Sequence, residues 1–229
     1  MQQRIGRFVV GPKLYVLWNN ALEQHRAIKQ APLALLFKSK SLLPGQWLQF
    51  LMDHVYIFCL LERLVSEHPE LVIYKYLKQF QRSKLLINSL PQPPIELPPV
   101  SSTAKKLPSL VGSNATYLEW FSFVFFGELW FGGSVHAKVV EALLRRNTAW
   151  MELYRLQEPR LRTEMSRVTG VWDFGTFHFK VQSIQCYFQE LESALQSSST
   201  TEYQNIKLAL LSAFEFANKV YSLSVYQDL

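Results

Sequence analysis

Apolar residues recur every three or four positions along most of this chain, and this spacing limits the possible folds more than any other feature of the sequence. Residues at that spacing share one face of an α-helix. The first such stripe lies between Pro12 and Pro32 and consists of Leu14, Trp18, Ala21, His25 and Ile28. Proline suits the first turn of a helix but not its interior. The sequence therefore predicts a first long helix from about residue 12 to residue 31.

The same spacing predicts further helices at about residues 44–67, 71–88, 114–146, 174–196 and 202–222. Ser113 and Asn114 are suited to cap one of them, and Ser199 with Glu202 forms a capping-box pattern. The helix after Asn114 is apolar nearly all round, which is typical of a buried central helix. Alternating β-branched runs bounded by Asn-Gly or Asp-Gly turns do not occur. We therefore expect an all-α bundle of about seven helices, without a sheet.

A proline-rich stretch interrupts the helical pattern near the middle of the chain. Prolines occupy positions 91, 93, 94, 98 and 99, which is typical of an extended connection and excludes a helix. Neither side of the stretch alone shows a complete set of amphipathic helices. We therefore expect an internal loop at about residues 90–108 within one domain that spans residues 1–229, rather than a boundary between two domains.

The charge and the cysteines narrow the possible partners and the compartment. The formal net charge is +6, but basic residues form only isolated pairs, so a nucleic acid or a membrane surface is not indicated. Cys59 and Cys186 lack metal-ligand spacing and suggest a reducing compartment. The N-terminal segment does not resemble a signal peptide, and the most apolar stretch, residues 117–133, is interrupted by Glu119 and Glu128. We expect a cytoplasmic protein that neither inserts stably into a membrane nor binds nucleic acid.

One of the five histidines stands out because of its place in the helical pattern. His25 lies on the inward stripe of the first predicted helix, whereas Glu23, Gln24 and Arg26 would face outward. A neutral imidazole on an apolar face needs a partner, and an iron ion suits it; a core histidine with a protein partner is the alternative. Three other histidines have no carboxylate or cysteine at ligand spacing: His54, His136 and His178. HExxH and CxxC patterns are absent, so a zinc site is not indicated.

Three glycines interrupt the most apolar predicted helix. Gly127, Gly132 and Gly133 fall within two turns of one another, and each costs roughly 1 kcal/mol relative to alanine inside a helix. Glycine lets another body approach the backbone closely, or lets the helix bend. The close neighbour could be a packed helix or a flat ligand. In the second case, Glu128 would stand where it can organise water.

These two features together resemble the heme oxygenase family, whose members carry a proximal histidine on the first helix and a Gly-Asp-Leu-Ser-Gly-Gly pattern on a distal helix. The segment that begins at His25 is similar to the family's first two helices without a gap, and its matching positions are Phe37, Trp47, Tyr56, Leu61 and Glu62. Residues 125–129 resemble the start of the distal motif, and Phe179 with Lys180 resembles the Phe-Lys pair of a later helix. The resemblance runs at low identity over about residues 14–223.

The resemblance implies a heme oxygenase-like all-α bundle and an enzyme that opens the porphyrin ring of heme to biliverdin, releasing iron and carbon monoxide. Heme would be both substrate and prosthetic group, and an electron-donating reductase would be a partner. His25 would be the axial iron ligand, and Glu128 would be the catalytic residue that organises water. The remaining implied residues contact the heme itself: Gly127, Gly132 and Gly133 on the distal face, and Lys180 at a propionate.

The sequence departs from the family pattern on the distal helix. Glu128 stands where the family has aspartate, so a water held by its carboxylate would sit differently. Trp130 and Phe131 separate Leu129 from the glycine pair, where the family has one residue. An inserted residue turns everything after it by about 100°, which would set Phe131 one turn above Gly127. A single π-bulge would absorb the extra residue instead; both arrangements are open at this point.

Other departures concern the propionates and the distal water network. Two basic positions of the family are occupied here by Trp18 and Ile184, which leaves Lys180, with Lys13, Arg4 or Arg7 as substitutes. Three tyrosine positions of the family are occupied by Phe58, Ser122 and Phe125. Because these departures affect function rather than the apolar framework, the alternative function is a non-catalytic heme- or tetrapyrrole-binding regulatory protein on the same scaffold.

Non-heme members of the same broad fold form a third possibility. A di-iron oxygenase needs Glu-x-x-His pairs on facing helices, but Glu67 and His68 are adjacent, and Glu128 and His136 are eight residues apart. A thiamine-salvage hydrolase needs an activated nucleophile, and Cys186 has no evident base near it in the sequence. The spacing therefore supports neither reaction.

Overall fold

The structure is a computed structural model, and it describes residues 3–91, 95–155, 161–169 and 177–222. Within these ranges, the side chains of residues 129–134, 161–164 and 177–180 lie outside the description. The described residues form twelve α-helices. The all-α class predicted from the helical spacing is confirmed.

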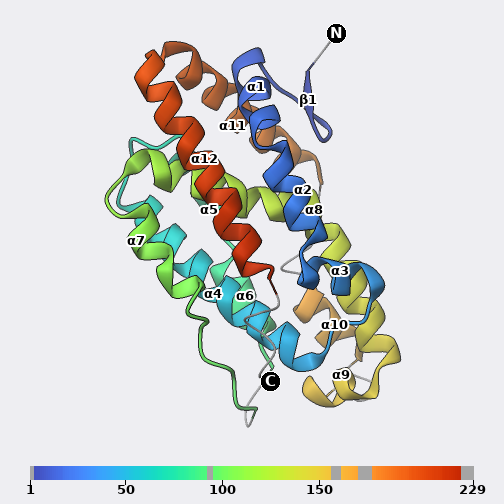
Figure 1. Cartoon of the computed structure of the whole chain (residues 1–229). Helices are drawn as coiled ribbons and strands as arrows, with labels where there is room; N and C mark the ends of the chain where they lie inside the picture. The colour runs from blue at the N-terminus through green and yellow to red at the C-terminus, as the bar shows by residue number, and fades with distance from the viewer. Residues whose placement is uncertain (1–2, 92–94, 156–160, 170–176, 223–229) are drawn as a thin grey trace.

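The helices follow one another in this order, with two 3-10 helices, η1 and η2, among them: α1 (Pro12–Asn20), α2 (Leu22–Gln30), α3 (Pro32–Ser39), α4 (Pro44–Ser66), η1 (Ile73–Tyr76), α5 (Leu77–Phe80), α6 (Ser83–Ser89), η2 (Ala104–Lys106), α7 (Leu107–Val111), α8 (Ala115–Arg146), α9 (Thr148–Leu153), α10 (Leu161–Thr169), α11 (Phe177–Ser197) and α12 (Thr200–Val220). Figure 1 shows α12 running beside α2, with α8 packed against α12. The bundle is thus built from many short helices around a few long ones.

The first predicted helix is divided in the structure. α1 ends at Asn20 and α2 begins at Leu22, with Ala21 between them at φ −102° and ψ 3°. Pro32 ends α2 but is also the first residue of α3, a helix that was not predicted. Proline is favourable at the first helical position, so the residue that stops one helix starts the next. The predicted stripe still faces inward, because Leu14 and Ala21 are almost fully buried.

The predicted helix at residues 71–88 is divided into η1, α5 and α6. The start of α6 is stabilised from α4, where the carboxylate of Glu62 accepts hydrogen bonds from the backbone N–H groups of Arg82 and Ser83 and from the Ser83 hydroxyl. These N–H groups lie at a helix start and have no intrahelical acceptor. Periodicity along the segment did not indicate this boundary, because the capping group comes from another helix.

A short β-hairpin precedes α1, although no sheet was predicted. β1 (Arg4–Ile5) pairs with the antiparallel β2 (Phe8–Val9), and Gly6 in the turn has φ 59°. Two residues per strand are too few to produce an alternating pattern in the sequence. The side chain of Gln185 on α11 holds the hairpin, since its nitrogen donates to the Val9 carbonyl over 2.6 Å and its oxygen accepts from the Val9 N–H over 3.2 Å.

α8 is the long central helix. It begins after Asn114, whose side chain accepts a hydrogen bond from the Tyr117 N–H, as predicted. Residues 118–127 are all buried, which confirms the prediction of a central helix for its first half. In Figure 1, α8 crosses the bundle and then turns toward α9. Although α8 is long and apolar, none of the described helices combines the length and hydropathy needed to cross a membrane.

The proline-rich stretch is tied to α4. Asp53 is fully buried and accepts a hydrogen bond from the Ser101 N–H over 2.8 Å, and the Gln49 amide donates to the Pro99 carbonyl over 3.0 Å. Residues 95–100 belong to no helix or strand, which agrees with the predicted loop, but η2 and α7 begin within its predicted range of residues 90–108. The organisation as one domain stays a prediction.

Candidate functional site

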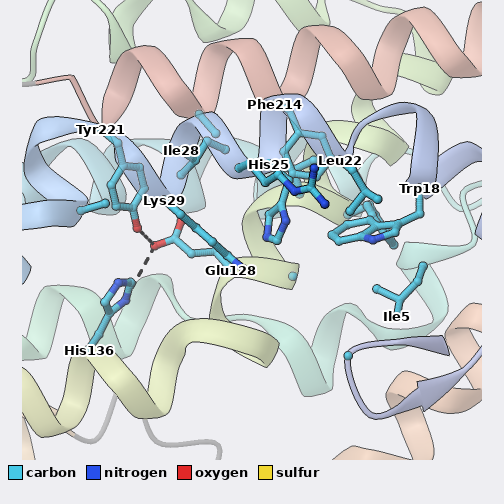
Figure 2. Close-up of a pocket in the computed structure, with 17 residues that line it drawn as sticks. Ile5, Trp18, Leu22, His25, Ile28, Lys29, Glu128, His136, Phe214 and Tyr221 are labelled. Atoms are coloured by element: carbon cyan, nitrogen blue, oxygen red, sulfur yellow. Dashed lines mark hydrogen bonds and ion pairs between the residues drawn. The ribbon is translucent and has the colours of Figure 1, made fainter. Parts of the chain in front are cut away.

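A cavity of about 460 Å³ lies between α2, α8 and α12. His25 lines it from α2, Glu128 from α8, and Phe214 and Tyr221 from α12 and the residue that follows it (Figure 2). Gly127 of α8 also lines the cavity. Three of the predicted site residues therefore face one cavity, although they come from distant parts of the sequence. The volume falls within the range of sites for small molecules.

His25 packs against aromatic rings inside this cavity. Its ring centroid lies 4.9 Å from that of Trp18 and 5.8 Å from that of Phe214, and no described residue forms a hydrogen bond with its ring nitrogens. Burial, together with the charges of Lys29 and Arg26, lowers the pKa of His25 to about 4. The imidazole is therefore neutral near pH 7, which is the form that donates a lone pair to a metal ion.

The helix pair α1–α2 is positioned by reciprocal contacts with α11. Glu192 accepts hydrogen bonds from the backbone N–H groups of Lys13 over 3.2 Å and Leu14 over 2.8 Å, and so caps α1. In return, Lys13 Nζ donates to the carbonyl oxygens of Leu195 over 2.7 Å and Gln196 over 3.3 Å at the end of α11. Anions favour a helix N-terminus and cations a C-terminus. Lys13 is therefore engaged at α11 and does not line the cavity, so it does not serve there as a substitute propionate partner.

Gly127 on α8 is buried and lines the cavity. The described backbone of α8 is α-helical from Ala115 to Arg146, without a π-helical turn. The sequence is compatible with a continuous α-helix or with a π-bulge. The structure has the continuous helix, so no π-bulge absorbs the extra residue. Position 131 lies about 40° around the helix from Gly127, whereas position 132 lies about 140° away. Gly132, Gly133 and the ring of Phe131 lie outside the described side chains.

Glu128 is held by side chains from three directions. Its Oε2 lies 3.3 Å from Nε2 of His54 on α4, and its Oε1 accepts a hydrogen bond from the hydroxyl of Tyr221. His136 Nδ1 lies 3.9 Å from the same Oε1 (Figure 2). Burial would raise the pKa of Glu128, but His54, His136 and Tyr221 together lower it below its ordinary value. The predicted water-organising carboxylate thus has direct side-chain partners.

In the sequence, neither His54 nor His136 has a carboxylate at ligand spacing. The structure brings Glu128 to both, from another helix in one case and from eight positions away on α8 in the other. Burial lowers the pKa of His136 to about 4, although the nearby Glu128 opposes this. Among the described residues, no group of three or more histidine, cysteine, aspartate or glutamate side chains is arranged to hold a metal ion. The sequence feature that could have indicated a buried role for His54 is its place on the apolar stripe of a predicted helix.

Two cations on α2 lie at the rim of the cavity. Arg26 and Lys29 are exposed, as expected for an outward-facing Arg26, and both line the cavity. Neither Arg4 nor Arg7 lines the cavity, and the guanidinium of Arg7 lies 5.2 Å from the centroid of the Phe8 ring. Lys180 belongs to α11, but its side chain is outside the described part of the chain.

The hydroxyl group at this site comes from a residue that was not predicted. Phe58, Ser122 and Phe125, at the positions where the family has tyrosine, are fully buried and do not line the cavity. Tyr221, at the end of α12, supplies the hydroxyl instead. Trp18 lines the cavity at one of the positions where a basic residue was expected.

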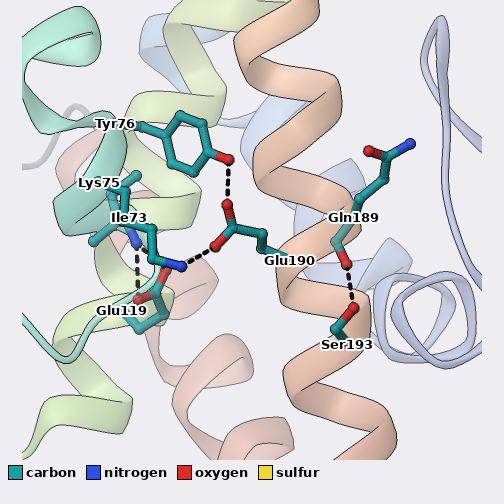
Figure 3. Close-up of polar contacts among 7 residues, drawn as sticks. All are labelled: Ile73, Lys75, Tyr76, Glu119, Gln189, Glu190 and Ser193. Atoms are coloured by element: carbon teal, nitrogen blue, oxygen red, sulfur yellow. Dashed lines mark hydrogen bonds and ion pairs between the residues drawn. The ribbon is translucent and has the colours of Figure 1, made fainter.

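Glu119 is a buried carboxylate outside the cavity. Glu119 accepts hydrogen bonds from the Ile73 N–H at the start of η1, over 3.2 Å to each oxygen, and from the Tyr187 hydroxyl over 2.7 Å. Burial raises the pKa of Glu119 to about 7, although these hydrogen bonds oppose it. Figure 3 shows Glu119 beside η1, where Tyr76 donates to Glu190 over 2.6 Å. The contacts of Glu119 indicate a structural role, because they cap η1 and connect it to α8 and α11.

No family model and no curated protein matches the sequence. Among solved structures, a heme oxygenase from Leptospira interrogans is similar, with a TM-score of 0.66 over 92% of this chain and 98% of that chain, at 18% sequence identity. At this level of identity, the similarity concerns the fold alone. The chain is an all-α bundle with the heme oxygenase-like fold.

Proposed function

We propose that this protein binds heme in the cavity between α2, α8 and α12, and that it opens the porphyrin ring. The observation that carries the proposal is the environment of His25: a neutral imidazole without a hydrogen-bond partner among the described residues lines a cavity together with the backbone of Gly127. The similarity in fold to a heme oxygenase structure supports it. His25 is the proposed axial ligand of the iron.

The lining of the cavity fits a flat apolar ligand with acidic groups at one edge. Trp18, Phe123 and Phe214 supply aromatic walls. Glycine at position 127 lets a ring approach the helix backbone closely. Arg26 and Lys29 at the rim are placed to pair with carboxylates. Three further heme contacts are proposed on the resemblance alone: Gly132, Gly133 and Lys180.

When bound, heme would supply the iron that activates dioxygen and the ring carbon that is oxidised, with electrons from a reductase, and the products would be biliverdin, iron and carbon monoxide. The chain would hold the ring, exclude water with its aromatic walls and keep a carboxylate at the distal side. That carboxylate is Glu128, the proposed catalytic residue, which lines the cavity while Tyr221 donates to its Oε1.

A hemin titration followed by absorbance tests the proposal. The wild-type protein should give a sharp Soret band, and His25→Ala should lose or shift it. His68→Ala is a matched control, because His68 pairs with Glu70 at the surface and should leave the band unchanged. The absence of a Soret band in the wild-type protein would overturn the proposal.

A second candidate function is heme or tetrapyrrole binding without ring opening. Two observations favour it: both oxygens of Glu128 have protein partners, and α8 places position 131 near the face of Gly127. Addition of ascorbate or a reductase to the heme complex separates the two functions. Biliverdin absorbance supports the oxygenase, whereas a stable heme spectrum supports the binding protein.

The wider setting is proposed from the sequence. We propose a cytoplasmic protein of one domain, which takes electrons from a reductase and does not bind nucleic acid. Fractionation of cells and a pull-down with candidate reductases would test the location and the partner.

A further inference from the structure

His54 lies behind Glu128, in the buried middle of α4. Its Nδ1 is 2.9 Å from the carbonyl oxygen of Phe50, and its Nε2 is 3.3 Å from Oε2 of Glu128. A carbonyl oxygen only accepts hydrogen bonds, so Nδ1 carries a hydrogen. Nε2 is then the atom that faces the carboxylate, and a hydrogen bond there requires one proton between Nε2 and Oε2. The contact therefore depends on a proton that the two residues share.

Further titratable side chains lie close to His54 and Glu128. Tyr221 donates to Oε1 of Glu128, and His136 Nδ1 lies 3.9 Å from that oxygen. Asp53 lies next to His54 on α4, and its carboxylate is held by Ser101 and Gln49. Within the described part of the chain, the titratable groups around the pair thus come from α4, α8 and the end of α12.

The burial of the two side chains differs. The side chain of His54 is fully buried, whereas that of Glu128 is 15% exposed and lines the cavity. Glu128 therefore stands between His54 and the cavity. A buried ion pair is weak evidence for stability, since apolar residues in its place are often as good or better. Packing of α4 alone does not account for a histidine at this position.

We propose that His54 is a positioning residue, which holds a proton against Oε2 and thereby keeps Glu128 ionised and directed at the cavity. The use of this arrangement in ring opening rests on the proposed function, but the arrangement itself does not need heme. Burial acts to raise the pKa of Glu128, and the largest effect that opposes burial is the charge of His54. Without His54, burial should therefore raise the pKa of Glu128.

Infrared difference spectroscopy of the heme-free protein tests the proposal directly. The protonated-carboxyl band of Glu128, identified by its loss in Glu128→Gln, is followed through a pH titration in the wild-type protein, in His54→Leu and in His54→Gln. We expect the midpoint to rise by about one pH unit or more in His54→Leu, because a neighbouring positive charge is lost. His54→Gln, whose amide can still donate to Oε2, should give a smaller rise.

Two controls keep the result interpretable. His68→Gln changes an exposed histidine that pairs with Glu70 and should leave the Glu128 band unchanged. Near-UV circular dichroism checks that His54→Leu is folded, and His54→Gln carries the test if it is not. Equal midpoints in the wild-type protein and in the folded His54 variants would overturn the proposal.

The heme complex gives an independent measurement. We expect His54→Gln to keep the Soret band while biliverdin formation falls by about tenfold or more, since the Glu128 carboxylate is less well held. A wild-type protein without a Soret band would refute the proposed function, yet the heme-free titration would still decide the role of His54. A wild-type rate of ring opening in His54→Gln would refute the catalytic use of the arrangement.

Discussion

Gly11 and Glu192 lie so close that a Cβ atom at position 11 would come within 2.2 Å of the Glu192 carboxyl carbon. The same carboxylate caps α1 through the N–H groups of Lys13 and Leu14. The absence of a side chain at position 11 therefore lets α11 hold the helix pair that carries His25.

Gly11→Ala should lower the free energy of unfolding by about 1–2 kcal/mol, the usual value of a helix cap, because the carboxylate must move away from α1. Urea unfolding measures the change. In a Glu192→Ala background the same substitution should cost much less, since neither the clash nor the cap is present. Equal costs in both backgrounds would contradict this account.

Arg26→Gln together with Lys29→Gln should weaken hemin binding by about three- to tenfold, because exposed ion pairs contribute up to about 1 kcal/mol each. Hemin dimethyl ester, which lacks the carboxylates, should bind both proteins equally. Fluorescence quenching or absorbance titration measures both affinities. Lys78→Gln, at an exposed lysine on α5, is the control. An equal loss of affinity for the dimethyl ester would show that the cations do not pair with propionates.

Glu119→Gln should change the pH dependence of stability. The pKa of Glu119 is raised to about 7 in the folded protein, against 4.5 ordinarily, so its stabilising contribution is complete below pH 4.5 and is lost as the pH rises through 7. The free energy of unfolding of the wild-type protein should therefore fall by about 3 kcal/mol across this window, whereas that of the variant should not. Urea unfolding at several pH values measures it, with the exposed Glu215→Gln as control. Parallel pH profiles for wild type and variant would contradict the prediction.

His136→Leu should have the opposite effect at acid pH. Burial lowers the pKa of His136 from 6.5 to about 4, so its contribution is present above pH 6.5 and is lost as the pH falls through 4. The free energy of unfolding of the wild-type protein should fall by about 3 kcal/mol over this window relative to that of the variant. Unfolding experiments between pH 7 and pH 4 compare the two proteins, and His68→Leu serves as the exposed control. A variant as acid-labile as the wild type would refute the assigned cause.

The sequence by itself determined the all-α class and several helix ends. α4 was predicted at residues 44–67 and observed at Pro44–Ser66, and the caps at Asn114 and Ser199 were both predicted. These features depend on residues within about four positions of each other, which is the range of helical spacing and capping. His25, Gly127 and Glu128 could be selected for the same reason, since each breaks a local pattern.

Only the tertiary structure decided the partners of Glu128 and the boundary at α6. His54 and Tyr221 reach Glu128 from α4 and from the end of α12, and Glu62 caps α6 from α4. Such contacts join side chains that are far apart along the chain, so they leave no periodic signal in the sequence. Hydrogen bonding and desolvation depend on which groups packing brings together, and for that reason the charge and direction of Glu128 followed only from the folded arrangement of the helices.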